Sequence, residues 1–133
     1  MRGILTALLD ARSESDANTR CLIVSCDMPF LTTEWLRFLL ERAARSGAEA
    51  VVPKSAKGWE PLCACWRVSA AEIVLPNFEA GTRKITEALN ALHVEVLDEK
   101  DWKRFDSDGR LFWNMNTQAD YDEARRVLQA ENM

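Results

Sequence analysis

Alternating blocks of apolar and polar residues predict that helices and strands follow one another along the chain. Residues 3–11 carry apolar side chains at helical spacing. The run from Cys21 to Cys26 is almost continuously apolar and bounded by polar residues, which is typical of a strand buried on both faces of a parallel sheet. The apolar residues that come next have the spacing of an amphipathic helix: Trp35, Phe38, Leu39 and Ala43.

The second half of the chain repeats this alternation. Short apolar runs predict strands over residues 50–53, 62–67, 94–97 and 111–113. Helical spacing predicts a helix over residues 85–92 and a last helix that opens at Thr117, with Asp120 three positions later. Because strands and helices alternate throughout, the pattern predicts a single α/β domain over residues 1–133, with helices on both faces of the sheet.

Composition and charge narrow the classes of partner. The 133 residues are 47% hydrophobic and 29% charged, which is ordinary for one folded domain. The net charge of −4 argues against a duplex-DNA or membrane-surface binder, since both need a basic face. The apolar stretch from Ile4 to Leu9 is too short and too interrupted for a signal peptide, and no run reaches the length of a membrane helix. We therefore expect a cytoplasmic protein that binds neither nucleic acid nor membranes.

The four cysteines do not form a redox or zinc motif. Cys21, Cys26, Cys63 and Cys65 contain no C-x-x-C pair and lie in apolar, strand-like surroundings. They are interpreted as reduced core residues. A zinc site would need His93 as its nitrogen ligand, and His93 is the only histidine in the chain.

Asp27 is the most informative single position, because it directly follows the predicted buried strand. The carboxyl edge of an open α/β sheet is where such folds bind ligands. Pro29 favours an extended Met28, so the Asp27 side chain should remain at this edge, where a carboxylate suits Mg²⁺. Alternatively, Asp27 is an ordinary turn residue or accepts hydrogen bonds from helix-end amides. Spacing by itself favours this simpler interpretation.

Asn114 and Asn116 are the second candidate pair. On an extended segment, two amides at positions i and i+2 point the same way and could hold a polar ligand. Asn and Thr are equally common in strand-to-helix turns, which is the simpler explanation of Asn114 to Thr117. Glu60 lies at a loop-to-strand junction and carries no signal by itself.

Four segments, taken in order, resemble the molybdenum cofactor guanylyltransferases (molybdopterin-guanine dinucleotide biosynthesis protein A), which belong to the nucleotidyltransferase superfamily. These segments are residues 3–8 (GILTAL), 26–31 (CDMPFL), 60–64 (EPLCA) and 110–117 (RLFWNMNT). The resemblance runs from Gly3 to about Leu128 and implies a Rossmann-like, mostly parallel sheet. Cytidylyl-transferring relatives tend to carry aspartates where this chain has asparagines, and usually lack Glu-Pro-Leu, so the resemblance favours guanylyl transfer.

The resemblance also implies an activity and roles for individual residues. The reaction joins GMP from GTP to the phosphate of molybdopterin and releases pyrophosphate. Asp27 would hold Mg²⁺ and contact the nucleotide, and Gly3 would border the nucleotide. Asn114 and Asn116 would line the place where the phosphate of molybdopterin meets the nucleotide.

The sequence departs from this family at its start. Family members begin with a strand and a glycine-rich loop that binds guanine and the triphosphate, whereas the five glycines here are widely separated. The chain therefore resembles the C-terminal two thirds of the family domain and is expected to be N-terminally truncated and inactive by itself. A misplaced start, a decayed gene or a partner that supplies the missing segment would each explain this, and self-association is expected. Two alternatives stay open: a noncatalytic pterin-binding or assembly fragment, and a cytidylyl-transferring relative.

Overall fold

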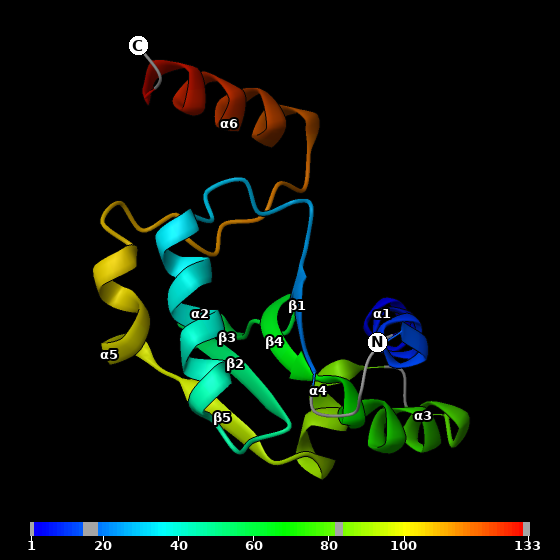
Figure 1. Cartoon of the computed structure of the whole chain (residues 1–133). Helices are drawn as coiled ribbons and strands as arrows, with labels where there is room; N and C mark the ends of the chain where they lie inside the picture. The colour runs from blue at the N-terminus through cyan, green and yellow to red at the C-terminus, as the bar shows by residue number, and fades with distance from the viewer. Residues whose placement is uncertain (1, 15–18, 82–83, 132–133) are drawn as a thin grey trace.

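The computed structural model describes residues 2–14, 19–81 and 84–131, and both helices and strands are present, as predicted (Figure 1). They do not alternate throughout, because β2, β3 and β4 follow one another with no helix between them. The strands are β1 (Arg20–Val24), β2 (Ala50–Ser55), β3 (Gly58–Trp59), β4 (Cys63–Arg67) and β5 (Val94–Leu97). The α-helices are α1 (Arg2–Glu14), α2 (Thr33–Arg45), α3 (Ala71–Glu79), α4 (Ile85–Ala88), α5 (Glu99–Trp102) and α6 (Gln118–Glu131). Short 3₁₀ turns are η1 (Val68–Ala70), η2 (Leu89–Ala91) and η3 (Lys103–Phe105).

The sheet is mixed, and its strands are mostly antiparallel. The strands lie in the order β1-β4-β2-β3, with β5 also paired to β2. The pair β2 and β5 is parallel, while β4 runs antiparallel to both β1 and β2. The prediction of a mostly parallel sheet was therefore wrong. Residues 56–62, which join β2 to β4, are too few for a parallel crossover of about a dozen residues, so the chain returns beside β2 in the opposite direction.

β1 is shorter and less buried than its sequence predicts. It ends at Val24, and its first four residues are only half-buried, while Val24 is 39% exposed. Its side chains reach both clusters, Cys21 and Ile23 the first and Leu22 the second, but they are only partly covered, so the prediction of a strand buried on both faces was wrong. In the described part of the chain β1 pairs with β4 alone. One edge of β1 is therefore free of strand pairing within that part.

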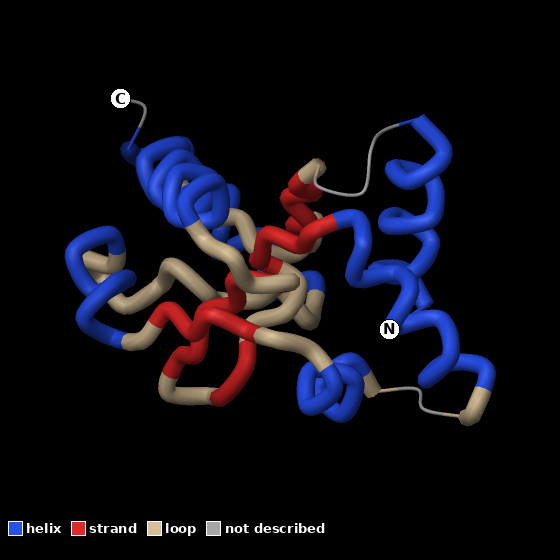
Figure 2. Tube along the Cα trace, turned by 60° about the horizontal axis from the view of Figure 1, so that its bottom comes forward, coloured by secondary structure: helices blue, strands red, loops and turns tan. Residues whose placement is uncertain are grey.

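Two hydrophobic clusters cover the two faces of the sheet, which confirms the prediction of helices on both sides. Residues of β2 alternate between them: Val52 packs with Ile4 and Leu8 of α1, whereas Val51 packs with Trp35 of α2. The first cluster also takes side chains of α3, and the second takes side chains from residues 97–112. Figure 2 shows helices on either side of the strands.

Residues 106–117 form turns and irregular backbone, so the predicted strand over residues 111–113 was wrong. Leu111 and Phe112 are buried in the second cluster, which explains their apolar character. The segment bends because the Trp113 amide donates to the Arg110 carbonyl (3.0 Å) and the Leu111 amide donates to the Asp106 carboxylate (2.9 Å). Among the described residues, no helix is both long enough and apolar enough to cross a membrane.

Candidate functional site

The Asp27 carboxylate lies just beyond the carboxyl end of β1, as the sequence predicts. The side chain is half-buried, and the Ser25 hydroxyl donates a hydrogen bond to its Oδ1. The Ser25 amide in turn donates to the Leu62 carbonyl at 2.7 Å. Because β4 runs antiparallel to β1, its first residues lie at this same edge, and the Glu60-Pro61-Leu62 turn is held beside Asp27.

One backbone hydrogen bond brings the two predicted groups of site residues together. The Met115 amide donates to the Asp27 carbonyl at 2.8 Å, although the two residues are far apart in sequence. Asn114 and Asn116, on either side of Met115, therefore lie at the Asp27 turn. Asn114 is half-buried and Asn116 is exposed.

The last helix opens where the sequence predicts. The amides of Asn116 and Thr117 donate to the Asp120 carboxylate at 2.9 and 3.2 Å, and the Asp120 amide donates to Thr117 Oγ1 at 3.1 Å. This reciprocal arrangement is a capping box, which fixes the direction in which the chain leaves the site. The segment is therefore a turn into a helix, as the simpler interpretation predicts, and it also lies at the Asp27 turn.

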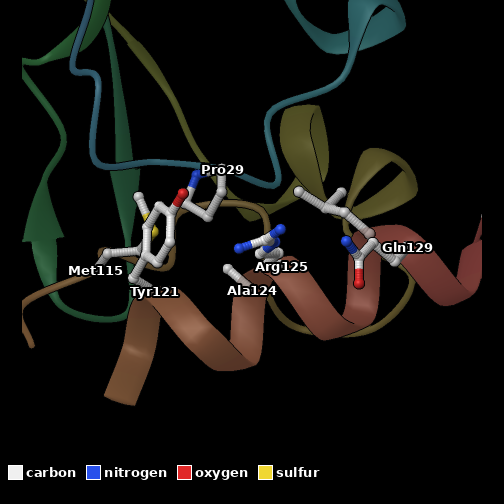
Figure 3. Close-up of a pocket in the computed structure, with 7 residues that line it drawn as sticks. Pro29, Met115, Tyr121, Ala124, Arg125 and Gln129 are labelled. Carbon is white, nitrogen blue, oxygen red and sulfur yellow. The ribbon is translucent and has the colours of Figure 1, made fainter. Parts of the chain in front are cut away.

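A hollow of about 240 Å³ separates α6 from the Asp27 turn (Figure 3). Pro29 and Met115 line one side, while Tyr121, Ala124 and Arg125 of α6 line the other. Most of this lining is apolar, and the guanidinium of Arg125 adds a positive charge to it. The arrangement can accept a group that is apolar at one end and anionic at the other.

Glu60 and Lys57 belong to the same edge, and sequence reasoning gave them no role. The Glu60 side chain is buried, with 8% of the residue exposed, and accepts a hydrogen bond from the Ser55 hydroxyl at 2.8 Å. Lys57 Nζ lies 3.8 Å from Glu60 Oε1 and donates to the Phe112 carbonyl at 2.8 Å. Glu60 had the Glu-Pro-Leu resemblance as a signal, whereas nothing in the pattern around Lys57 could have identified it.

The donor set at Asp27 is compatible with one magnesium ion that shares its ligands with a substrate. In the part of the chain that the structure describes, no three His, Cys, Asp or Glu side chains gather as a metal site. Mg²⁺ commonly takes only one or two carboxylates and completes its shell with water and phosphate oxygens. Asp27 Oδ1 is engaged by Ser25, and the described residues leave Oδ2 without a hydrogen bond.

Gly3 is not brought to this edge. It is exposed on α1, next to Ile4, whose side chain packs in the first hydrophobic cluster with α3. Met28, next to Asp27, packs in the second cluster on the opposite face of the sheet. The structure thus gives Gly3 no contact that would support a nucleotide-binding role, and that role stays a prediction.

The four cysteines are all free, and they differ in how far each is buried. Cys63 and Cys65 are buried, and loss of solvation raises the pKa of each thiol to about 11. Cys21 is half-buried, and burial raises its pKa as well. Cys26 is exposed directly beside Asp27, so the interpretation of all four as core residues was wrong for this one.

Comparison with known proteins places these features in a family. The molybdenum cofactor guanylyltransferase of Desulfosudis oleivorans is 29% identical over 128 residues, which are 96% of this chain and 60% of that protein. A probable molybdenum cofactor guanylyltransferase of Pelotomaculum thermopropionicum is 28% identical, over 99% of this chain and 60% of its own length. The chain thus spans about three fifths of the curated relatives it matches.

Solved structures give the same result for the fold. The crystal structure of molybdopterin-guanine dinucleotide biosynthesis protein A from Archaeoglobus fulgidus has a TM-score of 0.78 and 28% identity, over 92% of this chain and 60% of that one. A protein of Aquifex aeolicus shares the fold, with a TM-score of 0.65 and 18% identity. A family model described as the MobA-like NTP transferase domain matches residues 1–96, which is well over half of the chain. The chain therefore belongs to the family of MobA-like NTP transferase domains, and is a distant homologue of the molybdenum cofactor guanylyltransferases.

Proposed function

We propose that the protein acts in molybdenum cofactor biosynthesis, in the transfer of GMP from GTP to molybdopterin. Its supporting observation is the hydrogen bond from the Met115 amide to the Asp27 carbonyl, which joins the two segments that resemble family motifs. The relatives that are named guanylyltransferases and match nearly the whole chain support the same assignment.

In this proposal each residue at the edge has one task. Asp27 holds Mg²⁺, which when bound offsets negative charge on the phosphate oxygens. Asn114 and Asn116 orient the phosphate of molybdopterin through their amide groups, which can both donate and accept hydrogen bonds. Phosphoryl transfer depends on positioning and charge stabilisation, so no protein nucleophile is needed.

The test measures formation of the guanine dinucleotide from GTP, Mg²⁺ and molybdopterin. The chain is assayed by itself, where we expect no turnover, and joined behind the part of the Desulfosudis relative that precedes the matched stretch, where we expect transfer. In the joined protein, Asp27→Ala should lower the rate at least about 100-fold, because metal-bound phosphate is lost. Asp122→Ala is the matched control, since Asp122 is an exposed carboxylate on α6 whose only side-chain hydrogen bond among the described residues is accepted from Gln118.

The outcomes separate the alternatives. Unchanged turnover in Asp27→Ala would overturn the metal assignment. A preference for CTP over GTP would assign the protein to the cytidylyl-transferring relatives. A joined protein that folds and binds a pterin phosphate but transfers no nucleotide would favour the noncatalytic binding or assembly fragment.

A further inference from the structure

Two serine hydroxyls at this edge of the sheet each donate a hydrogen bond to a carboxylate, and the two carboxylates differ in what else surrounds them. Glu60, which accepts from Ser55 at 2.8 Å, is buried and has Lys57 Nζ 3.8 Å away. Asp27, which accepts from Ser25 through Oδ1, is half-buried, and the described residues leave its Oδ2 without a hydrogen bond. The first pair closes a contact inside the protein, whereas the second leaves one carboxylate oxygen open to a ligand.

Backbone hydrogen bonds fix the serine and the aspartate from two different segments. The Ser25 amide donates to the Leu62 carbonyl at 2.7 Å, which ties the serine to the turn before β4. The Asp27 carbonyl accepts the Met115 amide at 2.8 Å. The Asp27 amide also approaches Ser25 Oγ at 3.5 Å, the outer limit for a hydrogen bond. The Asp27 side chain can still rotate on this fixed backbone, and the Ser25 hydroxyl restrains that rotation.

The partial exposure of both partners indicates that this hydrogen bond orients the carboxylate more than it stabilises the fold. Ser25 and Asp27 are both half-buried, so water can satisfy either group when the bond is lost. A carboxylate that occupies several rotamers must be ordered when a cation binds, and that ordering lowers the affinity. Carboxylates that ligate metals are themselves commonly hydrogen-bonded, and loss of such a partner costs about 10- to 100-fold in metal affinity or activity.

We propose that Ser25 is a positioning residue whose hydroxyl holds the Asp27 carboxylate in one orientation, with Oδ1 occupied and Oδ2 available to a divalent cation. The inference rests on the proposed function, in which Asp27 holds Mg²⁺, and it adds a residue that acts through Asp27. The hydroxyl is the group that matters. Threonine keeps a hydroxyl and should replace the serine, whereas valine has the shape of threonine without the hydroxyl and should not.

The experiment applies two NMR measurements to the isotope-labelled 133-residue chain. Vicinal couplings about the Cα–Cβ bond of Asp27 report its rotamers without any metal. Mn²⁺ serves as the probe for Mg²⁺, since both prefer oxygen ligands, and it broadens the signals of nuclei near its binding site. In the unmodified chain we expect one Asp27 rotamer and broadening centred on Asp27. Ser25→Ala should average the rotamers and raise the Mn²⁺ concentration for half-maximal broadening about 10-fold or more.

Three further variants separate orientation from a general loss of structure. Ser25→Thr should restore both measurements, and Ser25→Val should behave like Ser25→Ala, which keeps the test valid if the alanine variant fails to fold. Ser55→Ala is the matched control, because it removes the same kind of hydrogen bond from Glu60. It should lower the midpoint of urea unfolding more than Ser25→Ala does, and it should leave both measurements at Asp27 unchanged.

The two measurements distinguish failure of this role from failure of the metal assignment. A single Asp27 rotamer in Ser25→Ala and Ser25→Val, or averaging that Ser25→Thr does not reverse, would overturn the role of Ser25 whether or not a metal binds. Asp27→Ala should abolish the localised broadening. If it does not, while the couplings follow the expected pattern, the orientation by Ser25 is supported and the metal assignment of the proposed function is overturned.

Discussion

Replacing Glu60 by alanine tests whether its buried carboxylate ties the loop after β2 to the turn before β4. Its hydrogen bond from Ser55 (2.8 Å) has an ionised acceptor, and such bonds contribute about 1.5–3 kcal/mol. The contact with Lys57 is long, at 3.8 Å, and Lys57 is 58% exposed, so solvent screening limits the ion pair to roughly 1 kcal/mol or less. We expect Glu60→Ala to lower the free energy of unfolding by about 2–3 kcal/mol.

Urea unfolding followed by tryptophan fluorescence measures this change. Ser55→Ala removes the same hydrogen bond from the other side and should cost about 1–3 kcal/mol, because a buried carboxylate loses its donor. Lys57→Met removes the long ion pair and the hydrogen bond to the Phe112 carbonyl (2.8 Å), and because Lys57 is exposed it should cost only about 1 kcal/mol, less than Glu60→Ala. The double variant Ser55→Ala/Glu60→Ala should cost less than the sum of the two single variants, because both remove one shared contact.

Two results would refute this reasoning. If Glu60→Ala unfolds within about 0.5 kcal/mol of the unmodified chain, the carboxylate does not hold the two segments together. If Lys57→Met costs as much as Glu60→Ala, the contacts of the ammonium with Glu60 and with the Phe112 carbonyl contribute as much stability as the Ser55 hydrogen bond.

Two further predictions concern the surface around β1. At pH 8 an aromatic disulfide reagent should react quickly with Cys26 and reach Cys63 and Cys65 only on unfolding, since pKa values of about 11 leave few thiolates at that pH. A fast phase that persists in Cys26→Ser would contradict this. We also expect concentration-dependent self-association through the edge of β1 that pairs with no strand in the described part of the chain. Val24→Lys should reduce it in light scattering, because a charged residue blocks edge pairing, and an unchanged particle size would exclude this edge.

The elements of the fold could be predicted from local pattern, but the directions of the strands could not. The apolar runs at residues 50–53, 62–67 and 94–97 each mark a strand to within a few residues. Direction depends on how the connections close, and the return of β4 beside β2 is decided by the short link through residues 56–62. How far the run after Cys21 is buried likewise depends on which side chains pack over the two faces of β1, and the local pattern does not contain that information.

The candidate site divides in the same way. Asp27 and Asn114 could be proposed from short motifs, and the hydrogen bond from Met115 to the Asp27 carbonyl brings their segments together. Glu60 and Lys57 gave no chemical signal, because each acquires its place from residues distant in sequence. Lys57, for example, is oriented by a carbonyl at position 112.

The turn that replaces the predicted strand over residues 111–113 decides which groups lie at this edge. In a strand, the Phe112 carbonyl would be used by a neighbouring strand and its side chain would alternate with exposed ones. In the observed turn, Leu111 and Phe112 both enter the core, and the backbone groups are satisfied by Asp106, Arg110 and Lys57. Hydrogen bonds of this kind help irregular backbone to stay ordered without a strand partner. The turn leaves Trp113 and Asn114 at this edge, directly before the Met115 amide that donates to the Asp27 carbonyl.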